Sequence, residues 1–189
     1  MTATDAKAAL VALVKQRSFQ SGAEMKLASG RTSSFYFNMK PTMLHPEGAR
    51  LIALLILDQL ERDRIAADLI GGLEMGAVPL ASAVAAVSAG SKRPLPAFFV
   101  RKQVKEHGTQ SLVEGLAKGE TLQGKKVVIV EDVTTTGGSA IKAADAVKRE
   151  GAIVVRVITV VDRREGASEA FKAAGLDFKP LLTVGDFGG

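Results

Sequence analysis

Apolar residues recur along the chain at two different spacings, one helical and one typical of buried strands. Helical spacing predicts amphipathic helices over residues 4–17 and 46–62, and Thr4 or Asp5 is available to cap the first. Pro46 suits the first turn of the second helix, because a proline needs no N–H partner there. The same spacing predicts further helices over about 78–89, 141–147 and 167–174.

Short apolar runs predict strands over about 67–72, 95–100, 127–130, 153–161 and 180–184. Since these strands alternate with helices through the latter two-thirds of the chain, we expect an α/β fold with a mainly parallel sheet covered on both faces. The first 40 or so residues differ, because turn residues at 27–33 precede the aromatic run Phe35-Tyr36-Phe37. We expect them to cap the sheet within one domain that spans residues 1–189.

Residues 127–140 join the most apolar run to a turn rich in hydroxyl groups and glycine. Four β-branched residues lead into Glu131 and Asp132, and a helix follows the turn. Backbone N–H groups in front of a helix dipole bind phosphate, and paired carboxylates suit sugar hydroxyls or a hydrated Mg²⁺. The stretch therefore predicts a sugar phosphate ligand. The alternative is an ordinary turn whose Ser or Thr only caps the helix. The turn residues are Thr134, Thr135, Thr136, Gly137, Gly138 and Ser139.

Composition narrows the classes of protein to consider. The chain has 189 residues, of which 47% are hydrophobic and 24% charged, as in globular proteins. The absence of cysteine excludes disulfides, thiolate zinc sites and thiol nucleophiles, and agrees with a reducing cytoplasm. No secretory signal or membrane span is indicated. The net charge of +5 suits anionic ligands, but its even spread and the few aromatic residues argue against nucleic acid.

Two glycine-containing segments resemble nucleotide-binding motifs without matching them. Residues 119–126 approach the P-loop pattern, but a strand follows them and Lys126 stands where a hydroxyl is required. Residues 71–76 lie between a strand and a helix, but their glycines lack the spacing of a dinucleotide fold. Neither motif is therefore predicted.

A polar segment with several basic groups follows the strand predicted at 95–100, and no protein nucleophile is evident. Together with the loop at 71–76 and the acidic pair, this segment suggests a substrate with two phosphate groups. One group would occupy the turn after the acidic pair. A pyrophosphate with Mg²⁺ would lie by the 71–76 loop, under the basic segment, where charge neutralisation favours a leaving pyrophosphate. The basic groups are Arg101, Lys102, Lys105 and His107.

The acidic pair and the turn after it resemble the phosphoribosyl-pyrophosphate signature of the type I phosphoribosyltransferases. Three further stretches are similar to the orotate-specific members: residues 29–38, residues 101–108, and Asp162-Arg163. The similarity covers nearly the whole chain in order. It implies a type I phosphoribosyltransferase fold, with a central mainly parallel β-sheet flanked by helices and a small N-terminal hood. It also implies transfer of ribose 5-phosphate from phosphoribosyl pyrophosphate to N1 of orotate, in pyrimidine biosynthesis.

The resemblance implies a role for each candidate residue. Glu131 and Asp132 would hold the ribose hydroxyls, and the turn residues 134–139 the 5′-phosphate. Tyr36 and Phe37 would flank the orotate ring, while Arg163 would face its carboxylate. Glu74 would lie in the pyrophosphate loop, and Arg101 would join the pyrophosphate contacts. The residues expected to act in catalysis are Lys102, Lys105, His107 and Asp132.

The resemblance further implies Mg²⁺ carried mainly by pyrophosphate, ribose hydroxyls and water, without direct protein ligands. It implies a cytoplasmic homodimer in which residues 101–112 are shared across subunits. Two positions depart from the family pattern. Glu74-Met75 replaces Tyr-Lys, and Ala28 replaces a lysine for which Lys26 or Lys40 is a candidate substitute. A transferase for a purine base and a non-catalytic regulator of the same fold remain as alternatives.

Overall fold

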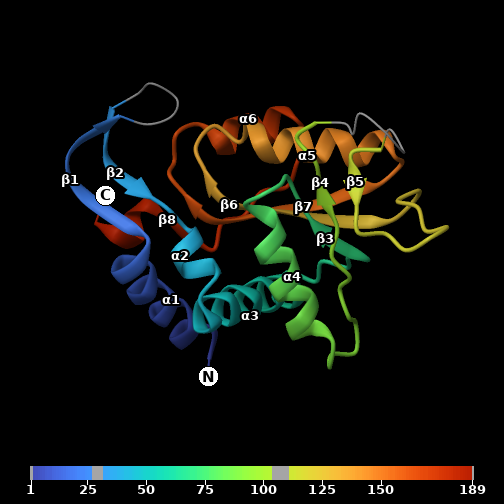
Figure 1. Ribbon diagram of the computed structural model, residues 1–189, viewed down its shortest axis with the longest axis horizontal. Helices are drawn as coiled ribbons and strands as arrows, with labels where there is room; N and C mark the ends of the chain where they lie inside the picture. The colour runs from blue at the N-terminus through green and yellow to red at the C-terminus, as the bar shows by residue number, and fades with distance from the viewer. Residues whose placement is uncertain (1, 27–31, 104–110, 189) are drawn as a thin grey trace.

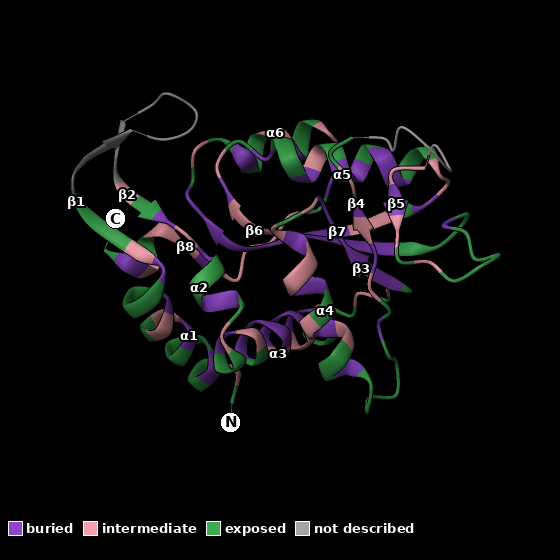
Figure 2. Cartoon of the chain, in the orientation of Figure 1, coloured by how far each residue is buried: buried purple, intermediate pink, exposed green. Residues whose placement is uncertain are grey.

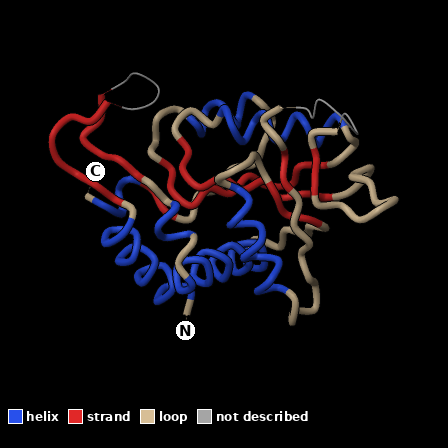
Figure 3. The backbone as a smooth tube through the Cα atoms, in the orientation of Figure 1, coloured by secondary structure: helices blue, strands red, loops and turns tan. Residues whose placement is uncertain are grey.

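A four-stranded parallel sheet lies between two layers of helices in the computed structural model, which describes residues 2–26, 32–103 and 111–188 (Figures 1 and 3). The α3 and α4 helices cover one face of the sheet, and α5 and α6 cover the other. This arrangement confirms the expected α/β fold. In spatial order the strands are β3 (Leu69–Gly71), β6 (Lys126–Thr134), β7 (Ile153–Asp162) and β8 (Leu182–Thr183). The helices are α3 (Pro46–Arg62), α4 (Ala77–Ser88), α5 (Gly138–Arg149) and α6 (Ala167–Ala173).

The central strand β6 is buried on both faces, which explains its continuous apolar sequence. Its side chains alternate between two hydrophobic cores, as the pleat of a strand requires. Val128 and Val130 pack in the core with α3 and α4, whereas Val127 and Ile129 pack with α5. All four residues are fully buried, and the sheet shows as a buried layer in Figure 2. The apolar run predicted at 127–130 thus fixes the middle of the molecule.

The N-terminal helix α1 (Ala3–Arg17) packs against α3 and is capped by Thr2. The Thr2 hydroxyl accepts a hydrogen bond from the backbone N–H of Asp5 at 3.1 Å, and the Asp5 carboxylate accepts one from the Thr2 N–H at 3.1 Å. This reciprocal capping box contributes about 1 kcal/mol to helix stability. The expectation that Thr4 or Asp5 is the cap was wrong, because the helix begins one residue before Thr4.

The predicted N-terminal hood is a hairpin of β1 (Phe19–Lys26) and β2 (Thr32–Phe37), followed by the short helix α2 (Lys40–Met43). The hairpin stands at one end of the sheet, near the C-terminus (Figure 1). Phe37 packs against Phe19 and Phe187, with ring centroids 5.0 and 5.1 Å away. Phe187 closes the 3₁₀ helix η1 (Val184–Phe187), so the hood is held by the last residues of the chain.

The strand predicted over residues 95–100 is shorter than expected. Only β4 (Phe99–Val100) forms a regular strand, and it pairs antiparallel with β5 (Val113–Glu114), which the sequence did not indicate. The segment still runs beside β3, because single parallel bridges join Ala97 to Ile70 of β3 and Val100 to Leu73, just after β3. Pro96 interrupts the ladder, since it accepts from the Ile70 N–H at 3.0 Å but has no N–H to donate.

Other boundaries also differ from the sequence expectation. The last strand is limited to Leu182–Thr183, and β6 extends beyond 130 to Thr134. The helix after the central turn begins at Gly138. No helix among the described residues is long and apolar enough to cross a membrane.

Candidate active site at the carboxyl edge of the sheet

Three separate segments meet where the strands end. Carboxyl ends of parallel strands lie at one edge of a sheet, so the residues after β3 and β4 are brought together with the carboxyl-terminal part of β6. The backbone N–H of Glu74 donates to the Val100 carbonyl at 2.8 Å, and the N–H of Lys102 donates to Glu74 Oε1 at 2.8 Å. A Cβ added to Gly76 would lie 2.6 Å from Asp132 Oδ1. The structure therefore assembles Glu74, Lys102 and Asp132, which the sequence placed far apart.

The sequence predicted the acidic pair at the end of its strand, whereas in the structure both residues lie inside β6. Glu131 is paired with Thr159 and Thr134 with Asp162 across the parallel ladder to β7. The turn after the pair is correspondingly short, and α5 begins at Gly138. Strand geometry thus fixes the two carboxylates more firmly than a loop would, which suits groups that must hold a ligand in one orientation.

The turn from β6 to α5 is built on Gly137, whose φ of 82° is left-handed. Gly137 is the N-cap residue, and no side chain caps the helix in the part of the chain described. The alternative in which Ser or Thr only caps this helix was therefore wrong. Uncapped N–H groups at a helix N-terminus are an anion-binding arrangement. A hollow of about 260 Å³ lies against the turn. It is lined by Thr134, Thr135, Thr136, Gly137, Gly138, Ser139 and Lys142, together with Glu131, Val133 and Ala140.

Two buried oxygens beside this hollow have no hydrogen-bond partner among the described residues: Glu131 Oε2 and Thr134 Oγ1. Burial raises the pKa of Glu131 to about 8, and the neighbouring Asp132 carboxylate adds to the rise, whereas the charge of Lys102 opposes it. Buried polar atoms in native proteins are normally satisfied. Two orphaned oxygens at the same edge of the sheet therefore indicate where a ligand with hydroxyl groups would bind.

Arg163 lies at the same edge, immediately after β7. Its backbone N–H donates to the Thr134 carbonyl at 3.0 Å, which ties it to the end of β6. Its guanidinium is nearly buried and forms an ion pair with Glu165, with Nη2 and Oε1 2.7 Å apart. Arg163, which we expect to bind the carboxylate of a ligand, is thus already paired with the carboxylate of Glu165.

The two aromatic residues expected to flank one ligand ring do not form a common wall. Tyr36 is 40% exposed, whereas Phe37 is 7% exposed and packs into the core beneath the hood. Adjacent residues of a strand point to opposite faces, so only one of them can face a ligand. The expectation for Phe37 is corrected accordingly, and Tyr36 remains the candidate.

The remaining basic candidates are only partly placed. Arg101 is half-buried and lies 3.7 Å from Glu114 of β5 through Nη1. Lys105 and His107 lie outside the described residues, as do Ala28 and the side chain of Lys26. Lys40 is exposed at the first residue of α2. Among the residues that the structure describes, no group of three or more His, Cys, Asp or Glu side chains could hold a metal ion.

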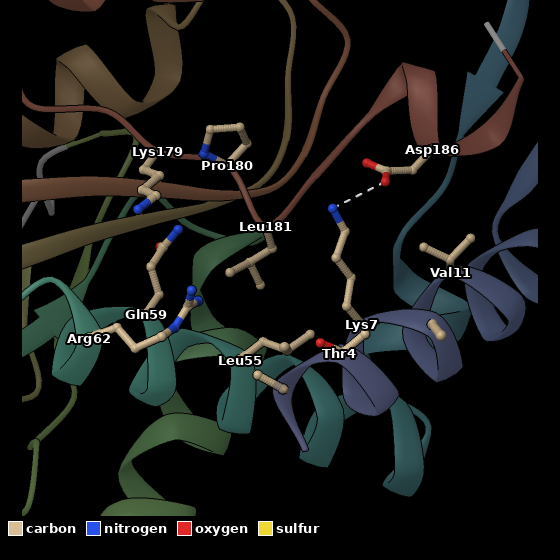
Figure 4. A pocket seen from close by; sticks show the side chains of 12 residues that line it. Thr4, Lys7, Val11, Leu55, Gln59, Arg62, Lys179, Pro180, Leu181 and Asp186 are labelled. Atoms are coloured by element: carbon tan, nitrogen blue, oxygen red, sulfur yellow. Dashed lines mark ion pairs between the residues drawn. The ribbon is translucent and has the colours of Figure 1, made fainter. Parts of the chain in front are cut away.

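A larger hollow, of about 620 Å³, is unrelated to this edge of the sheet. It lies between α1, α3 and the segment after β7, and shares no lining residue with the turn at 134–139 (Figure 4). Its Lys7 is paired with Asp186 at 3.1 Å, and its Lys179 with Asp63 at 2.8 Å. The lining cations already have carboxylate partners, so the chemistry points to the smaller hollow.

Comparison with known proteins identifies the family of the chain. The model of the phosphoribosyl transferase domain matches residues 43–174. A protein of Rhodopseudomonas palustris (strain BisB18) named orotate phosphoribosyltransferase is 58% identical over 187 residues, which cover 99% of this chain and 98% of that protein. The chain belongs to the orotate phosphoribosyltransferase family.

Solved structures of this family have the same fold. The orotate phosphoribosyltransferase of Mycobacterium tuberculosis H37Rv in complex with Fe(III) dicitrate gives a TM-score of 0.82 at 38% identity, covering 97% of this chain and 99% of that chain. The same enzyme in complex with phosphoribosyl pyrophosphate gives a TM-score of 0.79 at 35% identity, with the same coverage. The expected type I phosphoribosyltransferase fold is confirmed.

Two residues that shape this orotate phosphoribosyltransferase site were missed from the sequence. Glu165 pairs with Arg163, and Phe171 of α6 lies beneath Gly137, where an added Cβ would be 2.9 Å from its ring. An acidic residue two positions after a candidate arginine is a weak signal that could have indicated Glu165. No local signal indicates Phe171, because its contact depends on how α6 packs against the turn.

Proposed function

We propose that this protein catalyses the Mg²⁺-dependent transfer of ribose 5-phosphate from phosphoribosyl pyrophosphate to N1 of orotate, giving orotidine 5′-monophosphate and pyrophosphate. The observation that carries the proposal is the junction of the acidic pair in β6 with the uncapped N-terminus of α5. It is supported by the 58% identity to a protein named for this activity.

The ribose 5-phosphate portion fits this junction. The 5′-phosphate would accept hydrogen bonds from the turn at residues 134–139, in front of the α5 dipole. Glu131 and Asp132 would accept hydrogen bonds from the ribose hydroxyls, which would satisfy the orphaned Glu131 Oε2. The Asp132 carboxylate would stabilise the positive charge that develops on the ribose as the bond to pyrophosphate breaks. Asp132 is the residue of this pair assigned to catalysis.

The pyrophosphate would lie between the loop at residues 71–76 and the basic segment. Lys102 is fixed there through its backbone N–H, while Arg101, Lys105 and His107 are assigned to the same group by family resemblance. Glu74 would act in this loop through its contact with Lys102 and without touching pyrophosphate. When bound, Mg²⁺ would neutralise charge on the leaving pyrophosphate. The donor set fits such a shared ion, because Glu131 and Asp132 could contact it through water and ribose hydroxyls.

Orotate would lie between the hood and the end of β7. The exposed ring of Tyr36 would cover one face of the base, and Arg163 would pair with its carboxylate. A purine base lacks that carboxylate, so it would gain no charge-assisted contact from the guanidinium. This difference favours orotate over the alternative of a purine substrate. A non-catalytic regulator would have no need for such a group.

We further propose that the protein is a cytoplasmic homodimer in which the loop at residues 101–112 is shared across subunits, with Lys102 beside Glu74 of its own chain and Lys105 serving the partner's site, and that residues 1–189 form one domain. Mixing Lys105→Ala subunits with Asp132→Asn subunits should then restore part of the activity, because one site of each mixed dimer is complete. No recovery in verified mixed dimers would contradict the shared site.

The decisive assay follows the loss of orotate absorbance with phosphoribosyl pyrophosphate and Mg²⁺, and then with EDTA added. Adenine and hypoxanthine serve as control bases. Turnover of orotate that stops with EDTA supports the proposal. Turnover of a purine but not of orotate would overturn it, and binding without turnover of any base would favour the regulator.

A further inference from the structure

Glu165 lies two residues after Arg163 and holds its guanidinium by a short ion pair. The distance from Arg163 Nη2 to Glu165 Oε1 is 2.7 Å, and the two side chains are 6% and 27% exposed. A guanidinium carries five N–H groups, and a charge-assisted contact of this length fixes the direction in which the others point. Glu165 therefore influences how the arginine meets a ligand.

The backbone between the two residues is folded for this contact. Arg164 has a left-handed φ of 57°, and its N–H donates to Asp162 Oδ1 at 2.8 Å. Side chains two residues apart in an extended strand are separated by about 7 Å, so the bend at Arg164 is what brings the pair together. A left-handed non-glycine residue is disfavoured and persists where its surroundings hold it. The turn is thus built to keep Glu165 on Arg163.

We propose that Glu165 is a positioning residue that sets selectivity for the carboxylate of orotate by orienting Arg163 before the substrate arrives. The inference rests on the proposed function, in which Arg163 meets that carboxylate. An arginine side chain loses considerable rotamer freedom when a ligand fixes it. Fixing it beforehand removes that loss from the binding step, which tightens binding of the carboxylate.

Glu165 also carries a negative charge that repels the substrate carboxylate, and the two effects oppose each other. Its charge is already compensated by the guanidinium at 2.7 Å, and the substrate would approach from another side of the same group. The repulsion acts over the longer distance and is the weaker effect. Orientation of Arg163 is therefore expected to dominate, and removal of the Glu165 charge should weaken orotate binding.

The test replaces Glu165 by Gln, which keeps the shape of the side chain and removes its charge. The KM for orotate should rise about tenfold, as loss of one charge-assisted hydrogen bond implies. The KM for phosphoribosyl pyrophosphate should stay within about twofold, because that substrate does not contact Arg163. Glu169→Gln removes the same charge from an exposed position in the first turn of α6 and should change neither KM.

Two further variants separate positioning from a purely structural role. Glu165→Asp keeps the charge and should recover most of the affinity for orotate. In an Arg163→Ala background, Glu165→Gln should cause no additional rise in the KM for orotate, because its effect passes through the arginine.

The possible contrary results are distinct. A lower KM for orotate in Glu165→Gln would show that Glu165 competes with the substrate and would overturn the proposal. Equal rises in both KM values with a lower melting temperature would assign Glu165 a general structural role and would also overturn it. An unchanged KM in a variant whose parent converts orotate normally would refute this inference alone. Failure of the parent itself to convert orotate would refute the proposed function.

Discussion

Gly76 approaches Asp132 so closely that a Cβ added to the glycine would lie 2.6 Å from the carboxylate Oδ1. The contact joins the loop after β3 to the acidic pair of β6. We predict that Gly76→Ala lowers kcat/KM on the order of 100-fold, since a displacement of about 1 Å at a catalytic carboxylate is enough for such a loss. Steady-state kinetics with both substrates would measure it.

Gly90→Ala is the matched control for this substitution. Gly90 follows α4, and a Cβ added there meets no atom within 4 Å. Its activity should equal that of the parent protein. If Gly76→Ala were as active as Gly90→Ala, the close approach of the 71–76 loop would not be required for catalysis.

Sequence patterns were most informative where several local signals agreed on the same structure. The helix predicted over 46–62 is Pro46–Arg62, because the proline, the apolar spacing and the acidic Glu47 in the first turn all agree. The prediction of a buried strand at 127–130 was also confirmed. The extension of β6 through Glu131 and Asp132 was missed. These polar residues stay in the strand because β6 hydrogen-bonds to β7, and a prediction from apolar residues alone contains no information about strand pairing.

Side-chain contacts at the site were less predictable. The alternation of a strand, if applied to residues 35–37, would have separated Tyr36 from Phe37 and placed Phe37 in the core. The contact of Arg163 with Glu165 depends on the left-handed φ of Arg164. Arginine does not favour this conformation as glycine or asparagine does, so the sequence did not indicate the bend. The two-residue strand β5 is too short to show any period.

The left-handed Gly137 offers a second test of the phosphate turn. Gly137→Ala places a methyl group 2.9 Å from the ring of buried Phe171, in a residue whose φ of 82° already disfavours a side chain. The turn must shift, and the KM for phosphoribosyl pyrophosphate should rise roughly tenfold. Gly175→Ala has a φ of 64° and no atom within 4 Å, so it separates backbone strain from displacement of the turn. Equal KM values in the two variants would contradict the prediction.

Glu74 should act through the backbone of Lys102 and not through its own charge. Its Oε1 accepts the Lys102 N–H at 2.8 Å, an interaction that a glutamine oxygen can replace. We predict that Glu74→Gln keeps kcat/KM within about threefold of the parent, whereas Glu74→Ala loses about tenfold. Kinetics at varied phosphoribosyl pyrophosphate would show the difference. An equally large loss in both variants would instead indicate that the charge itself is needed.

The buried Arg156 should stabilise the fold without serving catalysis. It bonds Asp63 at 2.7 Å and Asp177 at 2.6 Å, and its side chain is 8% exposed. Arg156→Met keeps the length of the side chain but leaves both carboxylates without this partner, and should cost about 3 kcal/mol in unfolding free energy. Lys179→Ala removes a partner of Asp63 that is 45% exposed and should cost less than about 1 kcal/mol. Urea unfolding would measure the free energy of unfolding of both variants. Equal losses of stability would contradict the prediction that the buried Arg156 contributes more than the exposed Lys179.

The same cluster predicts sensitivity to acid. Lys179 and Arg156 lower the pKa of Asp63 from 3.8 to about 2. A lowered pKa contributes stability that is present above the unfolded value and is lost as pH falls through the folded one. The parent protein should therefore lose this contribution between about pH 4 and pH 2, and Asp63→Asn should show a shallower decline there. Thermal unfolding at stepped pH would measure it, and parallel curves would refute the assignment.

Glu131 predicts the opposite dependence at higher pH. Burial, reinforced by the Asp132 charge, raises its pKa from 4.5 to about 8. The folded protein then binds a proton more tightly than the unfolded chain does, so this stabilisation is fully present below about pH 4.5 and is lost as pH rises through about 8. Since each pKa unit corresponds to about 1.4 kcal/mol, Glu131→Gln should gain a few kcal/mol relative to the parent between pH 5 and 9. Glu61→Gln, at an exposed site on α3, should follow the parent curve. Urea midpoints across this range decide the matter, because a constant difference between Glu131→Gln and the parent would mean that Glu131 does not titrate there.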